Sequence, residues 1–324
     1  MMKESEKVRR DTYQRVTDLV VARLEAGEIP WSKPWVSTGS GDYLPANVSS
    51  GRAYTNLFNI LSLQWARDGE GRSFGSRYWI TYRQAKKLGG QVRKGEKSSF
   101  VIGWRRIEGK ADPDDPESKV KSYMACKASA VFNVGQVDGL DDLPRLQRER
   151  EGLEPEELTE FDPVSRAEAI VKGYRQCPPI THGGNKAYYA PLSDEIGMPE
   201  RRQFKSAEGY YSTLFHEMTH STGHTSRLNR KDVMDITRFG DHAYAREELT
   251  AEIGSSFLMA LAGLDNSAVL DNSAAYLKSW LRALKDDKKL VIMAAQRAGH
   301  AVDMIAPDVR SEAVDVDTDG DLLA

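Results

Sequence analysis

The sequence feature that most constrains this chain is a pair of histidines four residues apart, inside a segment with helical periodicity. Residues 206–224, SAEGYYSTLFHEMTHSTGH, are apolar at helical spacing and hold three of the six histidines. Residues four apart lie on one face of a helix, so His216 and His220 can direct ring nitrogens at one ion. Glu217 is rotated by about 100° and can reach a water molecule on that ion. The pattern therefore predicts two metal ligands and, in Glu217, a general base.

A third ligand is needed, because catalytic zinc takes three protein ligands and keeps one position open. The next predicted helix, REELTAEIGSSFL (246–258), places Glu248 and Glu252 one turn apart on one face. We expect Glu248 to be the third ligand and Glu252 to accept the N–H of a ligating histidine. Glu247 is the competing ligand, since a shift of one residue would present it instead. Otherwise Glu247 is a solvent-facing charge near the helix start.

Two further positions near the motif leave alternatives open. A third histidine three residues past Gly223 would complete another zinc pattern, but that position is Ser226. His224 remains an alternative ligand, although Gly223 is expected to end the helix before it. The preceding strand in NKAYYAP could pair with an extended peptide, and Tyr188 or Tyr189 could stabilise an oxyanion. Core and surface roles are the alternative for both tyrosines.

Basic and aromatic residues are concentrated in the front half of the chain. Residues 1–130 hold 23 Lys and Arg against 15 Asp and Glu, and five of the six tryptophans. Aromatic rings can stack on bases while cations follow the phosphates, a combination that suits single-stranded nucleic acid. For each single tryptophan, a place in the core is the alternative. The residues predicted to contact DNA are Trp31, Trp35, Trp79, Lys86, Lys87, Arg93, Lys94 and Lys97.

Other classes of protein do not fit the composition. No apolar run approaches the ~20 residues of a membrane-spanning helix, so we expect no membrane partner. The N-terminus is charged and lacks an apolar segment, so it is not a secretory signal. Two widely separated cysteines are consistent with reduced thiols. A cytoplasmic location is expected.

Periodicity and composition divide the chain along its length. Residues 1–135 mix helices with strands at 78–81, 98–107 and 122–134. Residues 136–160 are polar, charged and contain two prolines, which is typical of a linker. Residues 161–305 are mainly helical, with five predicted helices, and the acidic residues 306–324 are expected to be disordered. The predicted fold class is α+β, with a small N-terminal α+β DNA-binding domain joined to a mainly helical second domain.

The chain resembles the ArdC family of antirestriction proteins of conjugative plasmids and related elements, over nearly its whole length to about residue 305. In the front half the resemblance rests on RLEAGEIPWSKPW, WITYRQAKKLGGQVRKGEKS and AVFNVGQVDGL. In the back half it rests on AYYAPLSDEIGMP, FHEMTHSTGH and YAREELTAEIGSSFL. It implies an N-terminal single-stranded DNA-binding domain and a C-terminal zincin-like metallopeptidase domain, which together protect incoming DNA from host restriction.

Two functional classes remain open after this resemblance. In the first, the protein is a DNA-localised metallopeptidase that holds Zn²⁺, or another divalent ion such as Mn²⁺, and cuts a host restriction enzyme subunit or another DNA-bound protein. In the second, it is a non-proteolytic DNA-binding shield whose metal site is structural or vestigial. A third interpretation is a general peptidase with a basic surface.

Overall fold

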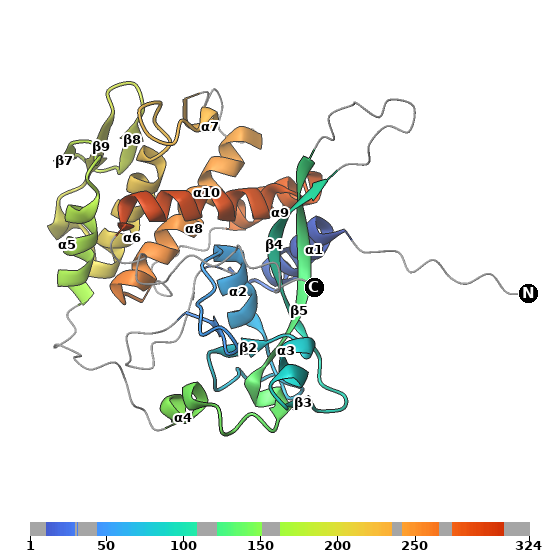
Figure 1. Cartoon of the computed structure of the whole chain (residues 1–324). Helices are drawn as coiled ribbons and strands as arrows, with labels where there is room; N and C mark the ends of the chain where they lie inside the picture. Colours follow the sequence, from blue (N-terminus) through green and yellow to red (C-terminus); the bar gives the residue numbers. More distant parts are fainter. Residues whose placement is uncertain are drawn as a thin grey trace, which may run out of the picture.

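The computed structural model describes residues 11–29, 31, 44–108, 122–150, 163–234, 242–265 and 274–307 of the chain. Helices and three small sheets alternate along it, which confirms the α+β class (Figure 1). Helices dominate the back half, as the sequence predicts. None of the described helices is both long and apolar enough to span a membrane.

The front half is built on a four-stranded sheet. Its order is β1 (Ala46–Asn47), β2 (Tyr78–Ile80), β5 (Ser122–Asn133) and β4 (Ser99–Glu108). β4 and β5 form a long antiparallel hairpin, and β1 and β2 are parallel. The β-branched and aromatic residues of these segments alternate with small or polar ones, which favours strands with one covered face.

Helix α2 (Leu57–Trp65) closes the outer edge of β4 with its side chains. The Asn59 amide donates to the carbonyl of Ile102 at 2.8 Å and accepts from its N–H at 2.6 Å. Ser62 donates to the carbonyl of Phe100 at 2.8 Å. The Asn59 side chain therefore pairs with β4 as a peptide group of another strand would, so this part of the edge is not open.

A second small core lies beneath this sheet. Helix α3 (Tyr82–Lys87) begins with a capping box made by Thr81 and Gln84. The chain then forms β3 (Gln91–Val92), which pairs with β6 (Val137–Asp138), and α4 (Pro144–Arg150) follows. Within the segment expected to be a linker, β6 and α4 thus pack on the front half. The buried apolar residues of this core include Ala46, Ile80, Ala85, Val92, Val137, Leu140 and Leu146.

A three-stranded sheet flanks the helices of the back half. Its order is β7 (Ile180–His182), β9 (Glu195–Met198) and β8 (Tyr188–Ala190), so β8 is an edge strand. β8 runs antiparallel to β9, and β7 runs parallel to it. Helix α5 (Pro163–Gly173) precedes this sheet. Two single-turn 3₁₀ helices, Val134–Gln136 and Arg201–Gln203, complete the short elements.

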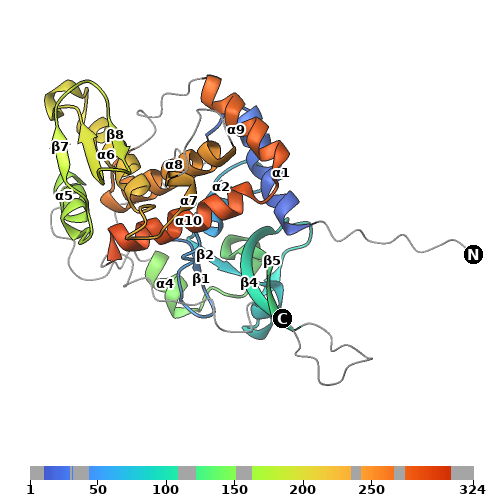
Figure 2. The ribbon, with the colours of Figure 1, turned by 90° about the horizontal axis from the view of Figure 1, so that it is seen from above.

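The remaining helices are α1 (Thr12–Glu25), α6 (Ala207–Ser221), α7 (Lys231–Met234), α8 (His242–Ala262), α9 (Ala274–Asp286) and α10 (Leu290–Ile305). Helix α10 packs against α8 and also against α1 and α2 (Figure 2). One continuous apolar core therefore joins the front and back halves. Its buried members include Val16, Val20, Phe58, Ile60, Leu249, Phe257, Ala298 and Val302.

Candidate metal centre

Helices α6 and α8 carry the predicted ligands and pack closely together. Ser206 caps α6 by accepting the N–H of Gly209, and Leu214 and Met218 bury its apolar face. A Cβ on Gly254 of α8 would meet the Thr219 side chain at 2.7 Å. Only glycine permits this approach, which brings the first turns of α8 beside the histidines of α6.

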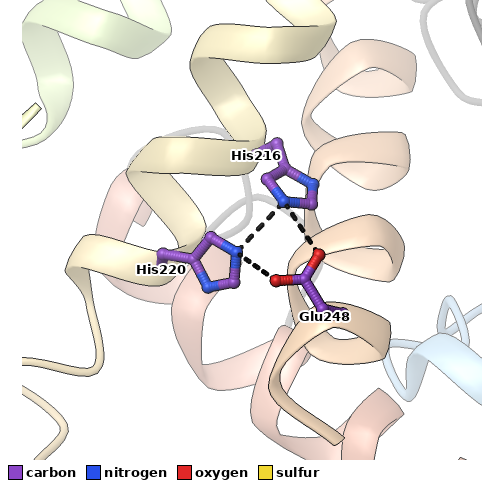
Figure 3. Close-up of side chains that lie close together, drawn as sticks. All are labelled: His216, His220 and Glu248. Atoms are coloured by element: carbon purple, nitrogen blue, oxygen red, sulfur yellow. Dashed lines mark hydrogen bonds and ion pairs between the residues drawn. The ribbon is translucent and has the colours of Figure 1, made fainter. Parts of the chain in front are cut away.

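Three side chains from these two helices point at one spot (Figure 3). The Nε2 atoms of His216 and His220 are 3.0 Å apart, and the carboxylate of Glu248 lies 3.7 Å and 3.5 Å from them. Ligand atoms bonded at 2.0–2.1 Å to a tetrahedral ion would be about 3.3 Å apart. Within the described chain, these three residues form the cluster whose donor atoms all lie within 4.8 Å. The three donors fit a divalent metal ion.

Glu217 lies beside this cluster without joining it. The residue is 9% exposed, and the backbone of Tyr189, in the edge strand β8, lies near enough to its carboxylate to favour the charged form. Burial raises the pKa of Glu217, and the nearby Glu248 carboxylate adds to that effect. Glu217 is therefore a carboxylate close to the three donors yet outside their cluster.

Each histidine has a second carboxylate behind its ring. Glu252 Oε1 lies 3.7 Å from Nδ1 of His216, and Glu247 Oε1 lies 3.2 Å from Nδ1 of His220. Glu252 therefore lies on the Nδ1 side of His216 but beyond direct hydrogen-bond distance, so its role as acceptor stays a prediction. Glu247 stands behind the other ring, a role that the sequence did not indicate. The signal missed is Arg230, a cation that the structure buries against Glu247.

The acidic surroundings leave the pair of histidines with unequal affinities for a proton. Burial lowers the pKa of His216 well below its ordinary value, and the neighbouring His220 adds to the effect. Burial also opposes charge on His220, but Glu247, Glu248 and Glu217 outweigh it and raise its pKa to about 9. Burial and the Glu248 carboxylate raise the pKa of Glu252 to about 7. Such a concentration of carboxylates favours a bound cation.

The other residues considered near the motif lie away from the ligand atoms. His224 has its Nδ1 2.8 Å from the Ser226 hydroxyl and is outside the cluster of donors. Tyr189 donates its hydroxyl to Asp194 at 2.8 Å, and Arg227 donates to that same hydroxyl. Tyr188 is 51% exposed, and its ring lies over Gly197, where no Cβ would fit. The Tyr189 hydroxyl is thus engaged by Asp194 and Arg227, and the Tyr188 ring packs on β9.

A group of exposed cations lies on α3 and the turn after β3, two elements that pack together. Tyr82, at the start of α3, is 45% exposed among them and was not singled out from the sequence. Arg93 is partly engaged, since it pairs with Glu96 at 3.0 Å and with Asp138 at 3.3 Å. We call this surface the basic face; its exposed members are Tyr82, Arg83, Lys86, Lys87, Arg93, Lys94 and Lys97.

Two of the three predicted tryptophans, Trp31 and Trp79, do not contribute to this face. Trp31 is 1% exposed, with its ring centroid 5.2 Å from that of Trp280. Trp79 is 2% exposed and packs edge-on against Phe74 at 5.4 Å. As placed, neither ring can stack on a base, and the core role left open for each tryptophan applies instead. Trp35 lies outside the described residues.

Comparisons with known families match the two halves separately. Residues 10–132 match the N-terminal domain of anti-restriction factor ArdC. Residues 165–297 match a family described as zincin-like metallopeptidase. The second match contains His216, Glu217, His220 and Glu248.

Whole-chain comparisons extend over both halves. The uncharacterized protein y4eC of Sinorhizobium fredii is 36% identical over 302 residues, which cover 90% of this chain and 91% of that protein. A DNA primase TraC of Escherichia coli is 37% identical across 88% of this chain, but the match spans only 19% of the primase.

Two solved structures are similar along almost the entire chain. The metal-free crystal structure of the antirestriction ArdC protein from plasmid R388 is 40% identical, with a TM-score of 0.70, and the match covers 93% of this chain and 98% of that one. The Mn(II)-bound structure of the same protein gives a TM-score of 0.66 at 40% identity, covering 92% and 98% of the two chains.

Proposed function

Since the chain belongs to the ArdC family of antirestriction proteins, we propose that it protects the incoming DNA of a mobile element from host restriction. In this proposal it binds single-stranded DNA and cuts a protein at the metal centre. The observation that carries the proposal is the position of Glu217 beside the converging donors of His216, His220 and Glu248. A purely structural metal site needs no such carboxylate.

We propose Zn²⁺ as the ion held by the three donors, with Mn²⁺ as the alternative, since a similar protein has an Mn(II)-bound structure. When bound, the ion would polarise a peptide carbonyl and lower the pKa of a water molecule to about 7. The Glu217 carboxylate would take the proton of that water and pass it to the nitrogen of the leaving amine. The nearby backbone of Tyr189 favours the charged form of this carboxylate, the form that a base needs.

The edge strand β8 is the proposed docking site for the peptide. β8 is an edge strand of the three-stranded sheet, and the backbone of its Tyr189 lies near the Glu217 carboxylate. An extended segment could add to this edge through main-chain hydrogen bonds. The proposed substrate is a subunit of a host restriction enzyme or another protein bound to the same DNA.

The basic face is the proposed site for single-stranded DNA. Its lysines and arginines are exposed, so they can contact phosphates without rearrangement of the fold. The exposed ring of Tyr82 can stack on a base, the role that the buried tryptophans cannot fill. Binding to single-stranded oligonucleotides should weaken steeply with added salt. If the protein does not bind single-stranded oligonucleotides in this salt-dependent way, a general peptidase with a basic surface is favoured instead.

A non-proteolytic shield is the second candidate, because the basic face and the metal centre lie on separate elements. α3 and β3 are at the opposite end of the molecule from α6 in Figure 1. The face could therefore cover DNA whether or not the metal centre cuts anything.

The substitution Glu217→Gln separates the two candidates. It keeps the size of the side chain and all three metal donors but removes the base. We expect the variant to bind metal normally and to lose protection of DNA transferred into a restricting host, measured against transfer into a non-restricting host. Glu208→Gln, on the first turn of the same helix, is the control. Full protection by Glu217→Gln would rule out proteolysis as its basis and leave the shield.

A further inference from the structure

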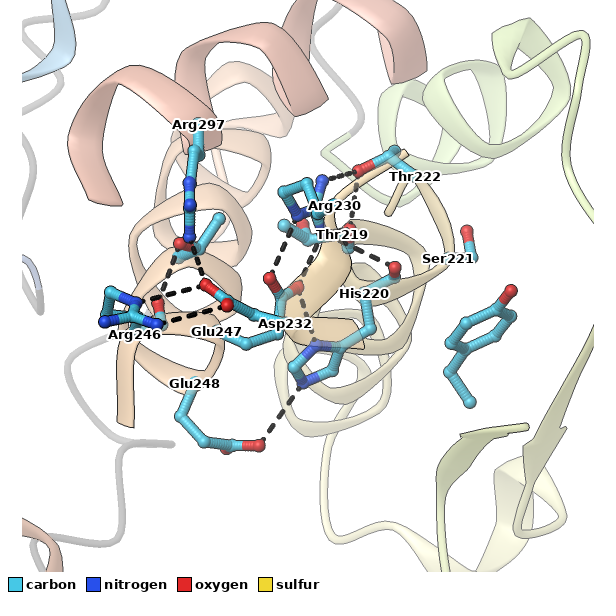
Figure 4. Close-up of polar contacts among 12 residues, drawn as sticks. Thr219, His220, Ser221, Thr222, Arg230, Asp232, Arg246, Glu247, Glu248 and Arg297 are labelled. Carbon is cyan, nitrogen blue, oxygen red and sulfur yellow. Dashed lines mark hydrogen bonds and ion pairs between the residues drawn. The ribbon is translucent and has the colours of Figure 1, made fainter. Parts of the chain in front are cut away.

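We infer that Arg230 and Glu247 form a positioning pair that orients the His220 ring for metal binding, an inference that rests on the proposed metal centre. Both side chains are buried, Glu247 completely. They lie on the side of His220 that faces away from Glu248, as Figure 4 shows. Neither residue would touch the ion; the pair acts through the histidine.

The first step is the contact between Glu247 and the ring. Oε1 of Glu247 lies 3.2 Å from Nδ1 of His220. A carboxylate is an acceptor here, so Nδ1 carries the hydrogen and the lone pair is left on Nε2. That Nε2 atom is the one beside His216 and Glu248. Glu247 therefore selects the tautomer and the rotation of the ring that the ion requires.

The second step explains why Glu247 itself is kept out of the ligand set. Arg230 donates from Nε to Oε2 at 3.0 Å and from a terminal nitrogen to Oε1 at 2.6 Å. This two-point contact engages both oxygens and balances the carboxylate charge in a buried place. Glu248, the next residue along α8, has no such clamp in the described contacts and stays directed at the histidines.

The same arginine also fastens the last turn of α6. Its guanidinium donates to the carbonyl of Thr219 at 2.8 Å and to the hydroxyl of Thr222 at 2.6 Å. A Cβ on Gly223 would lie 2.3 Å from Val233 and 3.0 Å from the Arg230 guanidinium, so glycine makes room for this arrangement. Arg230 thus fixes both the backbone that carries His220 and the carboxylate behind its ring.

The test measures metal binding directly in the full-length protein. Zn²⁺ affinity is determined by competition with a chromophoric chelator, and the visible absorption of the Co²⁺-loaded protein reports ligand geometry. Glu247→Ala should weaken Zn²⁺ binding about 10- to 100-fold and alter the Co²⁺ spectrum. Glu247→Gln should restore most of the affinity, since its amide oxygen can still accept from Nδ1. If Glu247 only stabilised the fold, Glu247→Gln and Glu247→Ala variants of equal stability would bind Zn²⁺ with equal affinity.

A matched control is Asp232→Asn, which alters another ion pair supporting α8 without touching His220. It should leave both the affinity and the spectrum unchanged. If Glu247→Ala fails to fold, Glu247→Asp, which withdraws the carboxylate by one methylene, must show the loss. An unchanged Zn²⁺ affinity in these Glu247 variants overturns the positioning pair while the metal centre stands. A wild-type protein that binds no Zn²⁺, Co²⁺ or Mn²⁺ overturns the metal centre itself.

Discussion

The metal centre and the basic face use charged side chains in opposite ways. In the centre, His220 is 8% exposed, Glu247 is fully buried, and each contacts a named partner. On the basic face, Lys86, Lys94 and their neighbours extend into solvent. The first region therefore holds its geometry before any ligand arrives, whereas the second offers charge without a fixed arrangement.

This difference sets how each region should respond to substitution. A buried network fails as a unit, because removing one member leaves the others unpaired in a place that water cannot reach. Exposed cations contribute separately, each by a small and salt-dependent amount. The comparison therefore predicts large, non-additive losses at the centre and small, additive ones at the face.

The largest effect is expected from Glu248→Ala, which removes one of three metal donors. Metal content should fall from about one ion per chain to almost none, measured by elemental analysis of the purified protein. Glu200→Ala, at an exposed carboxylate, should retain the ion. Retention of metal in Glu248→Ala together with its complete loss in Glu247→Ala would make Glu247 the ligand.

Trp79→Ala should follow in size, as a change in stability. The ring is buried against Phe74, so its removal leaves a cavity and should lower the free energy of unfolding by about 3–5 kcal/mol. Urea unfolding measures this loss. The affinity for single-stranded DNA should not change at temperatures where the variant stays folded. Weaker DNA binding with unchanged stability would instead indicate that Trp79 contacts DNA.

Asp232→Asn tests the ion pairs that join α7 to α8 and α10, and it should lower the free energy of unfolding by about 1–3 kcal/mol near neutral pH. Burial would raise the pKa of Asp232, but hydrogen bonds from Arg246 and Arg297 outweigh it and lower that pKa. A lowered folded-state pKa gives stability that is present above the ordinary value and is lost as pH falls through the folded one. The gap in unfolding free energy between wild type and Asp232→Asn should therefore narrow below about pH 4. If this difference in unfolding free energy stayed constant down to the pH of acid unfolding, Asp232 would not be an ionised partner of Arg246 and Arg297.

A loss of DNA affinity without a loss of stability is expected at the basic face. Tyr82→Ala should weaken binding of single-stranded oligonucleotides by about 1–3 kcal/mol if one base stacks on the ring. Thermal stability should not change, because the side chain is largely exposed. Tyr188→Ala removes an equally exposed tyrosine from β8 and serves as the control. Equal DNA affinity of wild type and Tyr82→Ala would show that no base stacks on Tyr82, and that the basic face binds DNA through phosphate contacts only.

The parts of the structure that depend on local periodicity could be predicted from the sequence. Four-residue spacing brings His216 and His220 together on α6, and the same spacing puts Glu248 and Glu252 on one face of α8. The α+β class and the family followed from segment patterns and quoted motifs. These predictions needed no knowledge of which distant residues meet.

The rest depends on contacts between segments far apart in the chain. Glu247 contacts the back of His220 while Glu248 faces both histidines. This difference depends on Arg230, which reaches α8 from the turn after α6. Trp31 is buried because Trp280, near the other end of the chain, lies against it. Hydrophobic and aromatic composition alone cannot distinguish such a ring from one that awaits a base.

The apolar core shared by both halves also limits how such a protein can be inherited. A gene fragment that stopped near residue 135 would encode α1 and α2 without the helices that cover Val16, Val20 and Phe58. The remaining fragment would expose the side of α10 that contacts α1 and α2, and exposed apolar surfaces of this kind lead to aggregation. Recombination should therefore preserve the two halves together, so that the basic face and the candidate metal centre are inherited as one unit.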